Sequence, residues 1–257
     1  MRQKLFGNQK VLVSALLLGV GFFFPQPAAA ITPEDPRVMK SVQSALKFLE
    51  NARDERLGGN CLIALCFKKA KIDDHPKIAQ AVDLCHKINI KDENLVDNYS
   101  LGIALMFLCE IEPKQYHDTI VTYVEEVLRR QKPFGGWGYP SSPRGDTSQT
   151  QYAILGLWMA KNMAEVEVPV DRMEAACGWL MRTQDPSGAW GYQGLDPGSL
   201  NRVAQTQVTV TLAASGAGQL YMVADLLQVT QNTEVPAEKK SKALQDIEVP
   251  GKKKQES

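Results

Sequence analysis

Two kinds of predicted helix alternate along most of this chain. In one kind, apolar residues recur at helical spacing and leave the opposite face polar, as at Val38, Val42, Leu46 and Leu49. In the other kind, apolar residues cover every side, as in residues 101–109. A helix with one apolar face borders solvent, whereas a helix that is apolar all round must be covered all round. The pattern therefore predicts an inner row of buried helices and an outer row that faces water.

This alternation gives about four helix pairs, each an outer helix followed by an inner one. The predicted segments are a helix from Pro36 and residues 61–70, a helix from Pro76 and residues 101–109, residues 120–131 and 152–160, and residues 170–184 and 203–214, resumed at 219–227 after Gly216 and Gly218. Asp97 and either Asp146 or Thr147 are suited to cap inner helices. Residues 208–211 are the only β-branched run, and their register with residues 151–154 favours helix. We therefore predict an all-α fold.

A motif with the spacing Gln-x-x-x-Gly-x-Trp occurs twice, 53 residues apart. It is formed by Gln131, Gly135 and Trp137, and again by Gln184, Gly188 and Trp190. A period of this size is typical of repeat architectures, in which each unit buries its apolar face against its neighbours. A glutamine at a helix end can bond open backbone groups while the tryptophan packs across its amide. We interpret both motifs as structural braces, with ligand stacking on Trp137, Tyr139, Trp190 and Tyr192 as the alternative.

These paired motifs resemble the prenyltransferase and squalene oxidase repeat of terpenoid cyclases and protein prenyltransferases. The motif match covers residues 125–215, while residues 36–112 share only the helix alternation. The resemblance implies an α/α toroid-like arc of about four helix pairs, with apolar inner helices and amphipathic outer helices. The toroids of that group contain more pairs, so this arc is expected to leave an apolar edge, which favours a partner or self-association.

The catalytic motifs of the resembled enzymes do not carry over. The Asp-x-Asp-Asp acid of the cyclases is missing, and Asp73-Asp74 is better suited to capping a helix. Asp83-Leu84-Cys85, with His86 or His117, matches the zinc ligands of prenyltransferases in letters only. Residues two apart on a helix point about 200° from each other, so Asp83 and Cys85 cannot bind one metal ion. We expect no cofactor and no metal, and catalytic residues stay unknown.

Polar residues cluster where the inner helices begin, and they predict a mouth at one end of the inner row. The candidate ligand-binding residues are Tyr99, Asp146, Gln149, Gln151 and Gln207. Hydrogen bonding between neighbouring helices is the alternative role for these side chains. We favour a non-catalytic scaffold that binds a small-molecule or protein partner. The alternatives are a terpenoid-cyclase-like or polysaccharide-acting enzyme that uses the mouth residues, and a structural role in the cell envelope.

Residues 1–30 predict a secretory signal peptide. Arg2, Lys4 and Lys10 precede an apolar run at 11–24, and three alanines supply a cleavage site before Ile31. This run has 14 residues, whereas a membrane span needs about 20, so export is favoured over a membrane anchor. The predicted location is periplasmic or extracellular, and the mature chain is not expected to be an integral membrane protein.

Charge and cysteine usage restrict the partners further. Removing the three basic residues of the signal peptide from 29 leaves 26, against 29 acidic residues, so the net charge is −3. Such a balance gives no electrostatic case for nucleic acid. The five cysteines lie in predicted helices as small hydrophobes, although one or two disulfides stay open as an alternative. Residues 231–257 lack aromatic residues and predict a disordered tail, or alternatively a partner-binding arm.

Overall fold

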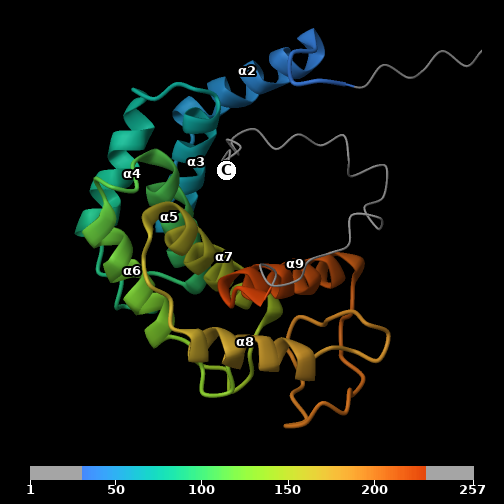
Figure 1. The fold of residues 1–257 in the computed structure, drawn as a ribbon. Helices are drawn as coiled ribbons and strands as arrows, with labels where there is room; N and C mark the ends of the chain where they lie inside the picture. The colour runs from blue at the N-terminus through green and yellow to red at the C-terminus, as the bar shows by residue number, and fades with distance from the viewer. Residues whose placement is uncertain (1–30, 230–257) are drawn as a thin grey trace, which may run out of the picture. The chain divides into compact units, whose positions relative to one another are not determined.

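The computed structural model describes residues 31–229, and this part of the chain is helical (Figure 1). The described residues hold eight helices and no strand, with a single antiparallel bridge between Asp146 and Gln193. The all-α fold predicted from the sequence is confirmed. The predictions of a signal peptide over residues 1–30 and of a disordered tail over residues 231–257 fall outside the described residues.

The chain divides into two compact units between Lys47 and Phe48. Helix α2 (Pro36–Asn51) crosses this division and begins at the predicted proline, a position at which the missing N–H of proline is not needed. None of the residues of α2 is buried within the described part of the chain. The apolar stripe that predicted an outer helix is therefore present in α2, but none of its residues is fully buried.

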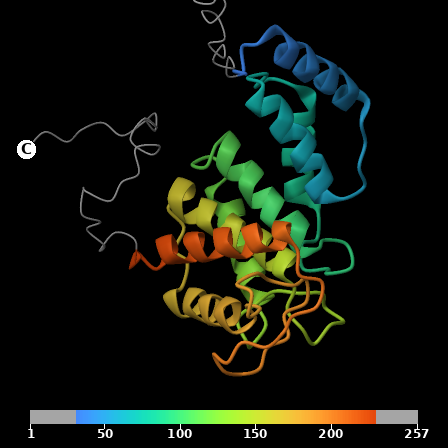
Figure 2. The ribbon, with the colours of Figure 1, turned by 90° about the vertical axis from the view of Figure 1, so that its right-hand side faces the viewer.

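Four helices of the unit from Phe48 onward contact one another in chain order. Helix α3 (Leu57–Lys69) packs against α5 (Asn98–Ile111), α5 against α7 (Thr147–Ala164), and α7 against α9 (Val210–Leu226). These helices contain the segments that are apolar on every side, and α5 buries nearly all of its length. Figures 1 and 2 show α9 lying across α7.

Three amphipathic helices lie against this inner row. Helix α4 (Pro76–Lys87) packs on α3, α6 (His117–Arg129) packs on both α5 and α7, and α8 (Val170–Arg182) packs on α9. Each buries a single face, as the periodicity of its apolar residues requires. Helix α8 lies beside α9 in both views (Figures 1 and 2).

The most extensive helix contact, between α5 and α7, depends on two glycines. A Cβ atom at Gly102 would lie 2.3 Å from the carbonyl oxygen of Tyr152, and one at Gly156 would lie 3.1 Å from the Cα of Gly102. The two backbones therefore approach more closely than any side chain larger than hydrogen allows. This close approach fixes the register of α5 against α7, and with it the positions of the polar residues at their N-termini.

Two of the predicted helix ranges leave out glycines that lie inside helices. Helix α3 begins at Leu57 and contains Gly58, whose missing Cβ makes room for the backbone of Ser100, 2.9 Å away. Helix α9 runs without interruption through Gly216, where a Cβ would lie 2.3 Å from the ring of Trp190. Both glycines serve helix packing. Residues 203–209, predicted as the start of the last inner helix, form a loop instead.

Candidate functional site

The first Gln–Trp turn, from Gln131 to Trp137, connects the end of α6 to the loop before α7. Gln131 Nε2 donates a hydrogen bond to Gly135 O at 2.7 Å, which closes the turn. Trp137 Nε1 donates to Val127 O at 2.7 Å, a carbonyl in the last turn of α6 that has no partner within its helix. Trp137 is completely buried, and Gln131 is 7% exposed.

The second Gln–Trp turn, from Gln184 to Trp190, makes the same bonds at the end of α8. Gln184 Nε2 donates to Gly188 O at 2.8 Å, and Trp190 Nε1 donates to Leu180 O at 2.9 Å. Gly188 has a φ of +90°, as Gly135 has +108° in the first turn, a conformation that glycine adopts without strain. Both amides and both indoles are therefore bound to backbone carbonyls of their own segment.

The two turns differ in what lies against them. Gln131 Nε2 also donates to Arg172 O of α8 at 2.8 Å, and a Cβ at Gly135 would lie 2.0 Å from Ala175 O. The first turn thus holds the N-terminal half of α8 by its backbone. At Gly188, no atom of the described residues lies within 4 Å of the Cβ position. Gln184 is only half-buried and bonds within its own turn alone.

Helix α9, the last helix of the inner row, leaves an uncharged and mostly apolar stripe exposed. Its exposed residues recur at helical spacing and carry no charge: Val210, Thr211, Ala214, Ala217 and Tyr221. Tyr221 is 76% exposed. The sequence predicted that the inner helices are covered on all sides. Within the described part of the chain this is wrong for α9, and also for α3, where Leu62 and Cys66 are exposed. The open turn and the uncovered stripe both belong to the last helix pair, α8 and α9.

The predicted mouth residues Tyr99 and Gln149 each bond to a side chain of the other helix, between the N-termini of α5 and α7; Asn98, the partner of Gln149, was not predicted. Tyr99 Oη lies 2.7 Å from Ser148 Oγ, and Asn98 Nδ2 donates to Gln149 Oε1 at 2.9 Å. The Tyr99 ring also meets Tyr152 edge to face, with centroids 5.3 Å apart. We call these side chains, with Asp146, Gln151 and Ser215, the polar seam. Tyr99, Asp146 and Gln149 therefore come together as predicted by their helix positions.

Asp146 is the carboxylate of this seam, and its geometry is that of an N-cap. Its Oδ1 atom accepts from the backbone N–H groups of Ser148 at 2.9 Å and of Gln149 at 3.0 Å, and from Ser148 Oγ at 2.5 Å. The side chain is 5% exposed. These hydrogen bonds satisfy the first backbone N–H groups of α7, so Asp146 caps the start of this helix.

Tyr99 is suited to hydrogen bonding and not to proton abstraction. Burial raises the pKa of its phenol, and the nearby Asp146 carboxylate adds to the rise, so the hydroxyl keeps its proton at neutral pH. Its bond with Ser148 acts in the opposite direction but is outweighed. The phenol can donate a hydrogen bond to a neighbouring group while it stays neutral.

Of the two remaining candidate residues, Gln151 lies in α7 and Gln207 lies in a loop. Gln151 Oε1 accepts from Ser215 Oγ of α9 at 2.8 Å, so this side chain joins α7 to α9. Gln207 was predicted from its echo of Gln151, but it lies exposed in the loop before α9 with a φ of +55°. Helix α9 begins three residues later than Gln207, so the predicted register was wrong. Gln207 is not part of the first turn of an inner helix.

The zinc-like letters Asp83-Leu84-Cys85 are separated by helical geometry. Asp83 pairs with Lys87 at 2.8 Å on the exposed side of α4, whereas Cys85 is buried, with its Sγ 3.7 Å from Cys61 Sγ. Among the residues that the structure describes, no group of three or more His, Cys, Asp or Glu side chains is placed to hold a metal ion.

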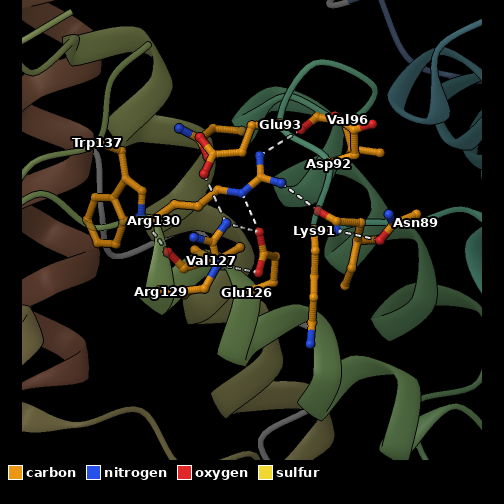
Figure 3. A network of polar contacts seen from close by, with 12 residues as sticks. Asn89, Lys91, Asp92, Glu93, Val96, Glu126, Val127, Arg129, Arg130 and Trp137 are labelled. Atoms are coloured by element: carbon orange, nitrogen blue, oxygen red, sulfur yellow. Dashed lines mark hydrogen bonds and ion pairs between the residues drawn. The ribbon is translucent and has the colours of Figure 1, made fainter. Parts of the chain in front are cut away.

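The sequence analysis did not predict the buried ion pair between Arg130 and Glu126 (Figure 3). Arg130 donates to Glu126 Oε1 at 2.6 Å and also to the carbonyl oxygens of Val96 and Ile90, at 2.6 and 2.5 Å. Arg129 adds a second pair of hydrogen bonds to Glu126, both at 2.8 Å. Burial raises the pKa of Glu126, but the bonds from the two arginines outweigh it and leave the pKa lowered. The signal in the sequence was only the spacing of four between Glu126 and Arg130.

Comparison with known proteins adds no assignment to this geometry. No protein-family model and no curated protein matches the chain. No helix among residues 31–229 is both long enough and apolar enough to cross a lipid bilayer.

Proposed function

We propose that this chain is a non-catalytic helical scaffold that binds an amphipathic helix of a partner polypeptide at the end formed by α8, α9 and the second Gln–Trp turn. The observation that carries the proposal is the contrast between two turns with the same hydrogen bonds. The first turn holds the backbone of α8 against Gln131 and Gly135, whereas no described atom lies within 4 Å of the Cβ position at Gly188 in the second turn.

The first turn indicates which chemistry the partner needs. It receives α8 through two main-chain carbonyls, those of Arg172 and Ala175. Both contacts are with the backbone of α8, and Met173, Ala176 and Leu180 belong to the apolar face that α8 buries. A partner for the second turn therefore presents the backbone of an amphipathic helix.

The surroundings of the second turn fit an apolar partner. Met181 precedes Gln184, the first residue of the second Gln–Trp turn, by three positions and is 45% exposed. The half-buried Cys177 lies on the same side, with its Sγ 4.0 Å from the Met181 sulfur. The exposed stripe of α9 is a second apolar surface, and it lies on the side of α9 opposite Gly216, which packs on Trp190 of the second turn. Exposed apolar patches mark interaction sites more often than scattered residues do.

The resemblance to the prenyltransferase and squalene oxidase repeat supports the same proposal. In an α/α toroid-like arc, each Gln–Trp brace is followed by a further outer helix, so an open brace marks the place of the next one. Residues 1–30 favour export, which would place this partner in the periplasm or outside the cell. The alternative of an enzyme that uses the mouth is disfavoured by the N-capping role of Asp146.

A peptide with the sequence of residues 168–183, with Cys177 replaced by serine, tests the proposal because α8 is the helix that the first turn holds. We expect the labelled peptide to bind the full chain with a Kd on the order of 100 μM, since a short helix loses conformational entropy on binding. Fluorescence anisotropy measures the affinity. Met181→Glu and Tyr221→Glu, both at exposed positions, should each weaken binding at least tenfold.

Met163→Glu is the matched control, because Met163 is 40% exposed at the C-terminal end of α7. It should bind the peptide as the unchanged chain does. Equal binding by all variants, or no binding by the unchanged chain, would overturn the proposal. Sedimentation of the chain without peptide distinguishes a second copy from a different protein as the source of the helix.

A further inference from the structure

Cys61 of α3 and Cys85 of α4 lie side by side in the core, and the function proposed above does not use them. Their Sγ atoms are 3.7 Å apart, and the side chains are 0% and 3% exposed. Each has a buried alanine one turn away on the same face of its helix, Ala64 and Ala81. Among the described residues, no other pair of cysteine sulfurs makes such a contact.

We propose that Cys61 and Cys85 are a disulfide site, closed when the chain folds in the presence of a disulfide donor. A disulfide requires sulfurs about 2.05 Å apart, so the two atoms need to approach by roughly 1.6 Å. The bond would join residues 24 positions apart and tie α3 to α4. In the unit from Phe48 onward, α4 packs mainly on α3, so this link would secure α4 to its main helix partner.

The oxidant is an external disulfide, either a small molecule such as glutathione disulfide or a protein dithiol–disulfide exchanger. One cysteine thiolate attacks the donor, which breaks the donor S–S bond and releases one thiol. The second cysteine then attacks the mixed disulfide and releases the other thiol. The protein loses two protons and two electrons as its S–S bond forms, and the donor gains both.

Burial of Cys61 and Cys85 in the folded chain limits the thiol–disulfide exchange. The hydrogen bond between the two thiols and their burial raise the pKa of Cys61, so the thiolate is scarce in the folded chain. Tyr123 of α6 donates to the carbonyl oxygen of Cys85 at 2.9 Å and closes the core over this pair. The bond therefore forms during folding, before α6 docks, and the reduced folded chain oxidises slowly.

The test starts from the full chain, reduced and denatured, and refolds it in a glutathione redox buffer. N-ethylmaleimide then blocks free thiols under denaturing conditions, and mass spectrometry counts and maps them. We expect two of the five cysteines to stay unlabelled and a peptide containing Cys61 to be linked to one containing Cys85. Five labelled cysteines, or a link through Cys66, Cys109 or Cys177, would overturn the proposal.

Variants separate this site from nonspecific oxidation. Cys61→Ser should abolish the linked peptide, whereas Cys109→Ser, also at a buried position, should keep it. The oxidised unchanged chain should unfold about 5–10 °C above the reduced chain, and Cys61→Ser should lose this difference. The peptide map of the unchanged chain decides the matter even where a variant fails to fold.

Discussion

Buried glutamine side chains connect distant segments of this protein at the scale of single residues. Gln131 donates to Arg172 O of α8, Gln205 donates to Leu195 O, and Gln219 donates to Thr147 O. An amide that is buried without such partners costs free energy, so these bonds are required by the burial itself. Removing one of these buried amides should therefore lower the free energy of unfolding more than removing an exposed amide does.

Replacing Gln131 by leucine should cost about 2–4 kcal/mol of unfolding free energy, because the carbonyls of Gly135 and Arg172, one bond buried and one part-buried, lose their donor. Gln184→Leu is the matched change in the second turn, where a half-buried amide makes one bond. It should cost about 1 kcal/mol. Urea unfolding of the two variants measures both values, and equal losses would contradict the difference in occupancy between the turns.

Glu126 should make stability depend on acid pH. Its folded-state pKa lies below the ordinary value of 4.5, so its contribution is fully present above pH 4.5 and is lost as pH falls through the folded value. Glu126→Gln should lower stability at neutral pH and flatten its fall below pH 4.5. Urea midpoints between pH 3 and 7, with the exposed Glu174→Gln as control, check the slope; parallel curves would refute this role.

The sequence allowed some of these residues to be predicted and not others. Gln131, Gln184 and their tryptophans stood out because a spaced motif recurs. Asp146 stood out because capping is local. Arg130 donates to the carbonyls of Ile90 and Val96, which lie 40 and 34 positions away. No local sequence pattern predicts contacts over such separations. Gln207 was misplaced because sequence similarity to Gln151 does not fix where a helix starts.

At the scale of helices, the contact of α5 with α7 depends on missing side chains. Gly102 and Gly156 face each other across it, and the backbone of Tyr152 fills the space where a Cβ at position 102 would lie. The alternation of apolar patterns predicted which helices meet. It could not show that Gly58 and Gly216 belong inside helices, because packing against Ser100 and Trp190 decides this and both neighbours are distant in sequence.

Gly102→Ala should therefore destabilise the protein by about 2–4 kcal/mol, since the added methyl group meets rigid backbone. Gly218→Ala is the control in α9, where no described atom lies within 4 Å of the Cβ position. That change should raise stability by about 0.5–1 kcal/mol through helix propensity. Thermal unfolding of both variants checks the opposite signs, and destabilisation by both would contradict the packing described here.

For the molecule as a whole, the two-layer packing from α3 to α9 is uneven at its last helix pair. Helix α5 is buried along nearly all of its length, whereas α9 keeps an uncharged stripe exposed and α3 exposes Leu62 and Cys66. No described atom lies within 4 Å of the Cβ position at Gly188 in the second Gln–Trp turn. The sequence predicted an apolar edge from an arc with few helix pairs. It could not locate the edge, because occupancy of each brace depends on contacts between segments.

Hydrogen–deuterium exchange with and without the peptide of residues 168–183 measures this edge most directly. A helix bound at the proposed place should slow the exchange of backbone amides at 181–190 and along 210–221, and leave α3 and α4 unchanged. Protection confined to other helices, or equal exchange at saturating peptide, would contradict a helix-binding site at α8 and α9.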